Sequence, residues 1–219
     1  MPKVTAEYLA DKRKFILECT EEVLKEKSLY LITMGDIIKK AGFSQGAIYR
    51  YYVNLDEIYI DFINKHTGDN HLEQRIDALL SSKQPERTIL TECFVAMGEY
   101  IEELLESVGG KTFFELIVYY SFDLEKTASV FPRLKYKQNL DCARNKIVEY
   151  GTSNIDKGIF KPQVPIRSLI QFVNIFIDGV AQMWYSMRQG AIHYDPGSAP
   201  DISEMFRTLA KAVINFLEG

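Results

Sequence analysis

The chain has no long apolar run and few cysteines and histidines. No stretch of about 18 uncharged apolar residues occurs, so we expect no membrane-spanning helix. Residues 1–13 are polar and charged without an apolar segment, so we expect no signal peptide and a cytoplasmic protein. The three cysteines, Cys19, Cys93 and Cys142, show neither zinc spacing nor a disulfide pattern. This pattern favours buried thiols in a reducing compartment.

Motifs for catalysis, cofactor binding and metal binding are also missing. The sequence shows no Ser-His-Asp set, no Gly-rich phosphate loop and no paired-carboxylate motif, so we expect no catalytic residue and no cofactor. His66 and His71 are five residues apart, off the i, i+4 spacing that a helical metal pair prefers, and the third histidine is His193. We therefore expect neither a metal site nor an enzyme, with a metal or haem sensor as an alternative.

The net charge of −4 argues against a protein that binds any polyanion, but the charge is unevenly distributed. Residues 27–55 contain four basic side chains against the single acidic side chain of Asp36. The basic residues are Lys27, Lys39, Lys40 and Arg50. A local basic face on an acidic body fits a protein that contacts phosphate with one end only.

Residues 33–52, TMGDIIKKAGFSQGAIYRYY, are typical of two short helices joined by a tight turn. Thr33 can cap the first helix, and Asp36 suits its first turn. Gly42 can end that helix, because only glycine reaches the left-handed conformation without steric cost, and Ser44 can cap the second helix. Apolar residues recur at helical spacing: Ile37, Ile38 and Ala41, then Ala47, Ile48, Tyr51 and Tyr52. The pattern predicts a helix-turn-helix.

The rest of the chain shows helical periodicity and no alternating strand pattern. One helix is predicted at 6–27, and another follows Asn54 and continues past Gly68 toward Leu80, with a possible bend at 67–70. A further helix is predicted from Pro85 to an end at Gly109-Gly110. The remaining predicted helices cover 111–126, 132–155, 166–189 and 202–217. Residues 111–126 could also suit a strand, but their length and helical neighbours favour a buried helix. We predict an all-α fold with two domains, 1–55 and 56–219.

The run at 33–52, followed by Asn54 and Asp56-Glu57-Ile58, resembles the TetR family of bacterial transcriptional regulators. The spacing Ala41-Gly42-x-Ser44 with Ile48-Tyr49-x-Tyr51-Tyr52 is far more specific than a bare helix-turn-helix, and the resemblance covers about residues 8–63. Beyond residue 65 it is weaker, and the outline is most similar to the subgroup of the Bacillus regulator called YfiR.

The resemblance implies a three-helix DNA-binding head, 1–55, and a connector helix into a larger helical ligand-binding and dimerisation domain, 56–219. It also implies an Ω-shaped homodimer that pairs through the last two long helices and leaves double-stranded DNA when a ligand binds. A dimer also suits the task, because two recognition helices about 34–36 Å apart can read a palindrome.

The predicted DNA contacts lie in and around the second helix of the helix-turn-helix. Gln45 can pair with adenine, Arg50 with guanine or phosphate, and the Tyr49 hydroxyl with a phosphate oxygen. The small Gly46 and Ala47 let the helix approach the groove floor. The full predicted set is Thr33, Met34, Gly35, Ser44, Gln45, Gly46, Ala47, Tyr49, Arg50 and Tyr51. Arg50 could instead be a solvated surface charge, and Tyr49 could be half-buried packing. The family usually carries a lysine where this chain has Leu55, so one phosphate anchor is missing.

An apolar cavity with a few polar groups is predicted in the larger domain. Its predicted lining is Phe94, Met97, Tyr100, Phe113, Ile117, Tyr120, Asn174, Asp178 and Trp184. These residues could also be ordinary core, since aromatic stripes at helical spacing usually pack. Asp178 and Asn174 lie one turn apart in an apolar helix. The Asp178 carboxylate could meet a cationic ligand, cap a neighbouring helix or pair across the dimer.

The sequence thus predicts a homodimeric repressor that binds a palindromic operator and is released by a small apolar or aromatic effector. The first alternative is a DNA-binding regulator controlled by a protein partner, without a small-molecule pocket. The second is an enzyme that uses the aromatic cavity, although no catalytic motif supports it.

Overall fold

The structure is a computed structural model that describes residues 5–67, 71–188 and 201–218. All regular secondary structure in these residues is helical, which confirms the all-α prediction. The chain forms two compact units. The first unit consists of residues 1–68 and 108–135, and the second consists of residues 69–107 and 136–219. The domain boundary at residue 55 stays a prediction. No helix in the described part is long and apolar enough to cross a membrane.

The first unit is built around a small apolar core beneath the helix-turn-helix. It contains α1 (Ala6–Glu26), η1 (Leu29–Leu31), α2 (Met34–Ala41), α3 (Gln45–Ile48), α4 (Leu55–Thr67), α7 (Val108–Tyr120), α8 (Leu124–Val130) and η2 (Phe131–Arg133). Ile16 of α1, Ile37 of α2, Ile48 of α3 and Phe62 of α4 are completely buried in one cluster. Because each helix contributes a buried side chain, the position of α3 is fixed from below and its other face is left to solvent.

The close approach of α7 to α4 explains Gly109, the first glycine of the pair Gly109-Gly110. A Cβ at Gly109 would lie 2.5 Å from the Cβ of His66, so only glycine fits there. The prediction that a helix ends at Gly109-Gly110 is wrong. The preceding helix ends at Glu106, Ser107 is extended, and both glycines lie in the first turn of α7.

Two further predicted helix boundaries differ from the structure. One helix is predicted from Asn54 toward Leu80, whereas the structure assigns two helices to this range. These are α4, which ends at Thr67, and α5 (His71–Leu80). Residues 68–70, where a bend is predicted, lie outside the described residues. The helix predicted over 111–126 ends at Tyr120. A new helix, α8, begins at Leu124 because the Asp123 side chain accepts a hydrogen bond from the Lys126 amide and caps it.

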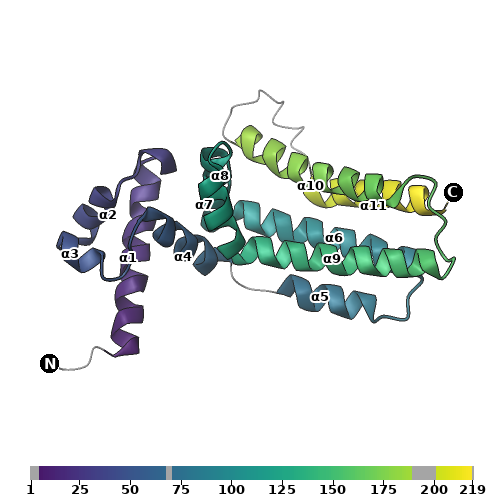
Figure 1. Ribbon diagram of the computed structural model, residues 1–219, viewed down its shortest axis with the longest axis horizontal. Helices are drawn as coiled ribbons and strands as arrows, with labels where there is room; N and C mark the ends of the chain where they lie inside the picture. The colour runs from purple at the N-terminus through teal and green to yellow at the C-terminus, as the bar shows by residue number, and fades with distance from the viewer. Residues whose placement is uncertain (1–4, 68–70, 189–200, 219) are drawn as a thin grey trace. The chain divides into compact units, whose positions relative to one another are not determined.

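The second unit is a bundle whose helices run with nearly parallel axes (Figure 1). It contains α5, α6 (Glu86–Glu106), almost all of α9 (Lys135–Asp156), α10 (Ile166–Arg188) and α11 (Ile202–Glu218). Gly98 of α6 lies directly against the buried ring of Phe206 on α11, so these two helices pack closely. The turn after α9 is made by Gly158, whose φ of 73° is left-handed.

Candidate nucleic-acid interface and effector pocket

The start of α2 is fixed by a reciprocal capping box. The Asp36 amide donates to Thr33 Oγ1 at 3.3 Å, and the Thr33 amide donates to Asp36 Oδ2 at 2.9 Å. Lys27 forms an ion pair with the same carboxylate, and its hydrogen bond, followed by those from Thr33, lowers the pKa of Asp36 to about 2. Asp36 is therefore ionised at neutral pH, where it complements the positive end of α2. The predicted Thr33 cap is confirmed.

The turn between α2 and α3 follows the sequence prediction with one exception. Gly42 has a φ of 67° and ends α2 in the left-handed conformation, as expected. Ser44 occupies the N-cap position of α3, but its hydroxyl makes no capping hydrogen bond. The prediction of a hydroxyl cap at Ser44 is therefore wrong. The turn is held instead by backbone hydrogen bonds, such as the one from the Ala47 amide to the Ser44 carbonyl at 3.0 Å.

The predicted DNA contacts share the solvent-facing side of the helix-turn-helix. Thr33, Gly35, Ser44, Gln45, Gly46, Tyr49 and Arg50 are exposed, and Met34, Ala47 and Tyr51 are half-buried. Ile48 and Tyr52, by contrast, are buried in the core. A Cβ at Gly46 would have no neighbour within 4 Å, so the backbone of α3 is open to a close partner there. The arrangement suits a helix that enters a major groove, and the individual contacts stay predictions.

The first turn of α4 contains two carboxylates that are both neutralised by groups from η2, α7 and α8. Arg133 donates from both Nη atoms to the two carboxylate oxygens of Glu57, at 2.7 and 2.9 Å. Asp56 accepts hydrogen bonds from the Tyr120 hydroxyl and the Lys126 ammonium. The Arg133 hydrogen bond holds the pKa of Glu57 below its usual value. We call these five residues the α4 clamp; sequence reasoning missed it because its cations lie about 70 residues from α4.

The α4 clamp lies next to position 55, where this chain has leucine in place of the family's usual phosphate-binding lysine. Leu55 packs against the core of the first unit, so it is a hydrophobic contact and contributes no positive charge. Asn54 caps α4, because its Oδ1 accepts a hydrogen bond from the Glu57 amide at 3.0 Å. With Asp56 and Glu57 paired, the acidic first turn repels a nearby phosphate much less than two free carboxylates would.

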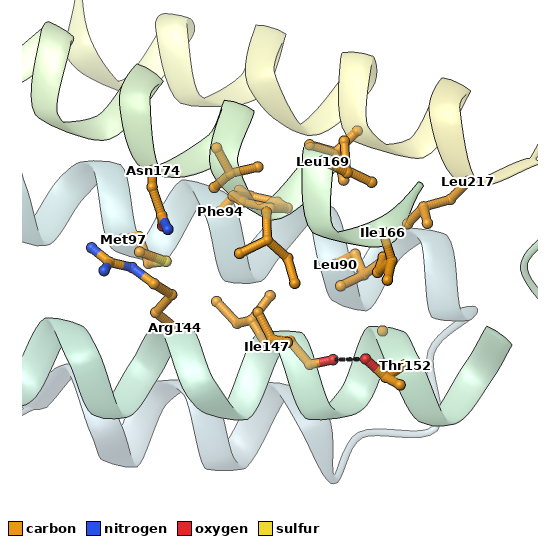
Figure 2. Close-up of a pocket in the computed structure, with 15 residues that line it drawn as sticks. Leu90, Phe94, Met97, Arg144, Ile147, Thr152, Ile166, Leu169, Asn174 and Leu217 are labelled. Carbon is orange, nitrogen blue, oxygen red and sulfur yellow. Dashed lines mark hydrogen bonds between the residues drawn. The ribbon is translucent and has the colours of Figure 1, made fainter. Parts of the chain in front are cut away.

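The second unit contains an apolar pocket with a volume of about 60 Å³ (Figure 2). Its walls come from α6, α9, α10 and α11, and almost all of the lining atoms are carbon. The lining residues are Leu90, Phe94, Met97, Arg144, Ile147, Val148, Gly151, Thr152, Ile166, Leu169, Ile170, Val173, Asn174, Val213 and Leu217. Three polar side chains belong to this lining. Arg144 of α9 and Asn174 of α10 lie beside Met97, and the Thr152 hydroxyl donates to the Val148 carbonyl at 2.8 Å (Figure 2). By its composition, this lining suits a mainly apolar molecule.

Three of the nine predicted ligand residues, Phe94, Met97 and Asn174, line this pocket. Tyr100 does not: it is buried, its hydroxyl accepts a hydrogen bond from Asn139 at 3.0 Å, and its ring stacks on Tyr136. The other five residues lie elsewhere. Phe113, Ile117 and Tyr120 belong to α7 of the first unit, while the exposed Asp178 and the half-buried Trp184 of α10 are not among the lining residues.

None of the lining residues predicted from the sequence lies on α9, although α9 forms one wall of the pocket. Arg144 stands in an apolar row of that helix, with Leu140 before it and Ile147 and Gly151 after it. An arginine at helical spacing among buried apolar residues was the available signal. The described residues contain no group of three or more histidine, cysteine or acidic side chains that could hold a metal ion.

Residues 16–61 match the family model described as bacterial regulatory proteins, tetR family. The chain is 25% identical over 202 residues to a Bacillus subtilis protein named uncharacterized HTH-type transcriptional regulator YfiR, covering 92% of this chain and 90% of that one. Similar solved structures include the transcriptional regulator FadR of Bacillus subtilis in complex with stearoyl-CoA. It is 20% identical, with a TM-score of 0.57, over 94% of this chain and 99% of that chain.

A second solved structure is the TetR-family repressor FadR of Thermus thermophilus in complex with lauroyl-CoA. It is 16% identical, with a TM-score of 0.55, over 92% of both chains. A putative TetR-family regulator from Mesorhizobium loti is 12% identical, with a TM-score of 0.61, over 96% of this chain and 98% of that chain. At these identities, the structural likenesses establish a common fold.

Proposed function

Because the chain belongs to the tetR family of bacterial regulatory proteins, we propose that it is a homodimeric repressor that binds a palindromic operator through α3. A small apolar effector in the pocket of the second unit releases it from DNA. The observation that carries the DNA-binding role is the exposed edge of α3. Gln45 and Gly46 of α3 and Arg50 in the turn after it face solvent, while Ile48 anchors the opposite side of α3 in the core.

The exposed edge offers both kinds of contact that operator binding requires. Gln45 can accept and donate hydrogen bonds at an adenine edge, and such contacts distinguish one base from another. The Tyr49 hydroxyl suits a phosphate oxygen, and such contacts fix the position of the protein on the duplex. The capping box at Thr33 fixes the start of α2, where Thr33 and Gly35 are exposed as Gln45 is. One such unit reads too few base pairs to be selective, so we propose a dimer.

Apolar side chains exposed on α10 and α11 support a dimer interface there. Ile175 is 72% exposed, Phe172 is 44% exposed, and Phe216 of α11, which meets Phe172 edge to face, is 38% exposed. A Cβ at Gly179 would meet no atom within 4 Å, so this part of α10 leaves room for a close helix from a second copy. Contiguous apolar surface of this kind is typical of an interface.

The apolar pocket favours a small-molecule effector over control by a protein partner. Two structural neighbours are complexes with acyl-CoA, whose acyl chain is apolar. The carbon-lined walls here suit an apolar chain of the same kind, although the similarity to those structures is limited to the fold.

Selection of bound sequences from random DNA, at two salt concentrations, tests the DNA-binding role. We expect a palindrome whose half-sites are about one helical turn apart, and weaker binding at higher salt. Gln45→Ala should relax the base preference at one symmetric pair of positions, and Tyr49→Phe should weaken binding to all sequences alike. Gln163→Ala, at an exposed glutamine of the second unit, is the matched control and should change neither property. Recovery of no palindrome would contradict the proposal.

A further inference from the structure

Two polar atoms in the pocket of the second unit are buried without a hydrogen-bond partner. They are the Nε of Arg144 and the Oδ1 of Asn174, and neither is paired with any group in the described residues. Figure 2 shows Arg144 rising from α9 and Asn174 descending from α10, with their polar ends at the same end of the pocket. Buried polar groups are nearly always paired in folded proteins, so two unpaired atoms in one cavity indicate a missing polar partner.

The charges around Arg144 favour an anion as that partner. Its Nη1 lies 3.5 Å from Asp141 Oδ1, but Asp141 also accepts a hydrogen bond from Lys137 at 2.8 Å. One carboxylate therefore faces two cations, and this group of three retains one positive charge. The next cation along α9, Lys146, is already paired with Glu73 and Asp77. A ligand cation would be repelled at Arg144, whereas a carboxylate would complete the pairing.

The rest of the pocket lining is apolar, and the pocket volume limits the length of the ligand chain that can bind. Leu90, Ile166 and Leu217 line the end away from Arg144 and Asn174 (Figure 2). A volume of about 60 Å³ corresponds to about four to six water-sized groups. A chain of roughly four to six carbon atoms, with its head at the polar end, therefore fills this space, and a chain of eight carbon atoms requires the lining side chains to move apart.

We propose that the pocket binds a medium-chain carboxylate. The carboxylate accepts the Nε–H of Arg144 with one oxygen. The Asn174 amide, turned by 180° about its terminal bond, donates from Nδ2 to the other oxygen. The alkyl chain runs along Phe94 toward Leu217. The proposal names the effector class of the proposed function and rests on it only in treating this cavity as the effector site.

Calorimetry with the full-length protein and eight-carbon probes that differ only in their head group tests the assignment. Octanoate should bind more tightly than octanol, and octylamine should bind least. From butyrate to octanoate, each added methylene should lower the Kd roughly fourfold until the cavity is filled. The chain contains a single tryptophan, Trp184 on α10, so its fluorescence gives an independent titration. Octanol or octylamine binding as tightly as octanoate would overturn the carboxylate assignment.

Substitutions test separately how the charge of Arg144 and the shape of the cavity contribute to binding of octanoate. Arg144→Gln should raise the Kd of octanoate roughly tenfold to a hundredfold and leave that of octanol nearly unchanged. Arg144→Lys, which keeps the charge but lacks Nε–H, is the second variant and should fall between Arg144→Gln and wild type. Gly151→Leu should fill the cavity and abolish binding of both probes, since Gly151 lines it with open space at its Cβ position. Lys157→Gln removes an exposed cation beyond α9 and is the matched charge control.

Operator binding by the same samples, with and without octanoate, separates this inference from the proposed function. Octanoate binding that depends on Arg144 but leaves operator affinity unchanged would support the site and refute release by this effector. Operator binding without any octanoate binding would overturn the site and leave the DNA-binding role intact. Octanoate binding of equal strength in wild type and Arg144→Gln would likewise overturn it.

Discussion

Replacing Gly98 by alanine should loosen the packing of α6 against α11. The new Cβ would lie 2.7 Å from the Cγ and 2.8 Å from the Cβ of Phe206. Phe206 is completely buried, and its ring meets that of Phe176 on α10 at 5.8 Å, edge to face. The clash therefore involves the base of a confined side chain, which cannot turn away without disturbing a third helix.

The expected loss can be estimated by comparison with a second helical glycine. Alanine in place of glycine inside a helix contributes about 1 kcal/mol of stability by propensity alone, and overpacking a core costs about 1–3 kcal/mol. At Gly151 of α9 a Cβ would meet nothing within 4 Å, so Gly151→Ala should show only the gain. The difference between the two variants isolates the clash, and we expect Gly98→Ala to be less stable than Gly151→Ala by about 1–3 kcal/mol.

Urea unfolding and thermal unfolding, both followed by circular dichroism, measure the free energy of unfolding and the Tm of both variants against wild type. For a chain of this length, each kcal/mol corresponds to about 2–4 °C in Tm, so the two variants should differ by several degrees. Adding Phe206→Leu to Gly98→Ala should cost less than the two changes made separately, because the leucine leaves room for the new methyl group. Equal stability of Gly98→Ala and Gly151→Ala would refute the close-contact argument.

Three further predictions concern the first unit. Thr33→Ala should reduce stability by about 1 kcal/mol and weaken operator binding, as measured by unfolding and by gel shift, because the capping box is lost. Gly42→Ala should cost about 1–2 kcal/mol in the same unfolding assay, because alanine is strained at a φ of 67°. Arg133→Gln should cost about 0.5 kcal/mol at pH 7, a small value because the Arg133–Glu57 pair is partly exposed. Since pairing lowers the pKa of Glu57, its stabilisation is present above the unfolded pKa and is lost as the pH falls through the folded one. The difference between wild type and Arg133→Gln should therefore shrink below about pH 4.

The helix-turn-helix was predictable because its determinants are local. Thr33 and Asp36 are three residues apart and form a reciprocal capping box. Gly42 adopts the left-handed conformation that favours glycine at a helix end. Such signals act within one turn of helix, so the sequence alone displays them. Ser44 shows the limit of this reasoning: its position was predicted correctly, but its hydrogen bond was not.

The pocket and the α4 clamp were not predictable in the same way. Helical spacing identified Phe94 and Met97 as inward-facing but gave no means to tell that Phe113 belongs to the other unit. In the sequence, Gly109 looks like a helix end. In the structure, glycine is required there because the backbone approaches His66, which lies on a helix more than 40 residues away in the chain. Pairings of this kind become visible only when the three-dimensional packing is known.

The discontinuity of the first unit limits how this protein can exchange parts with its relatives. A crossover after residue 68 would transfer α1 to α4 without residues 108–135. Asp56 and Glu57 would then lose Tyr120, Lys126 and Arg133, and two bare carboxylates would remain in the first turn of α4. The part of the chain that contains the helix-turn-helix together with the whole α4 clamp therefore comprises both segments, so a chimaera that retains it needs three junctions in place of one.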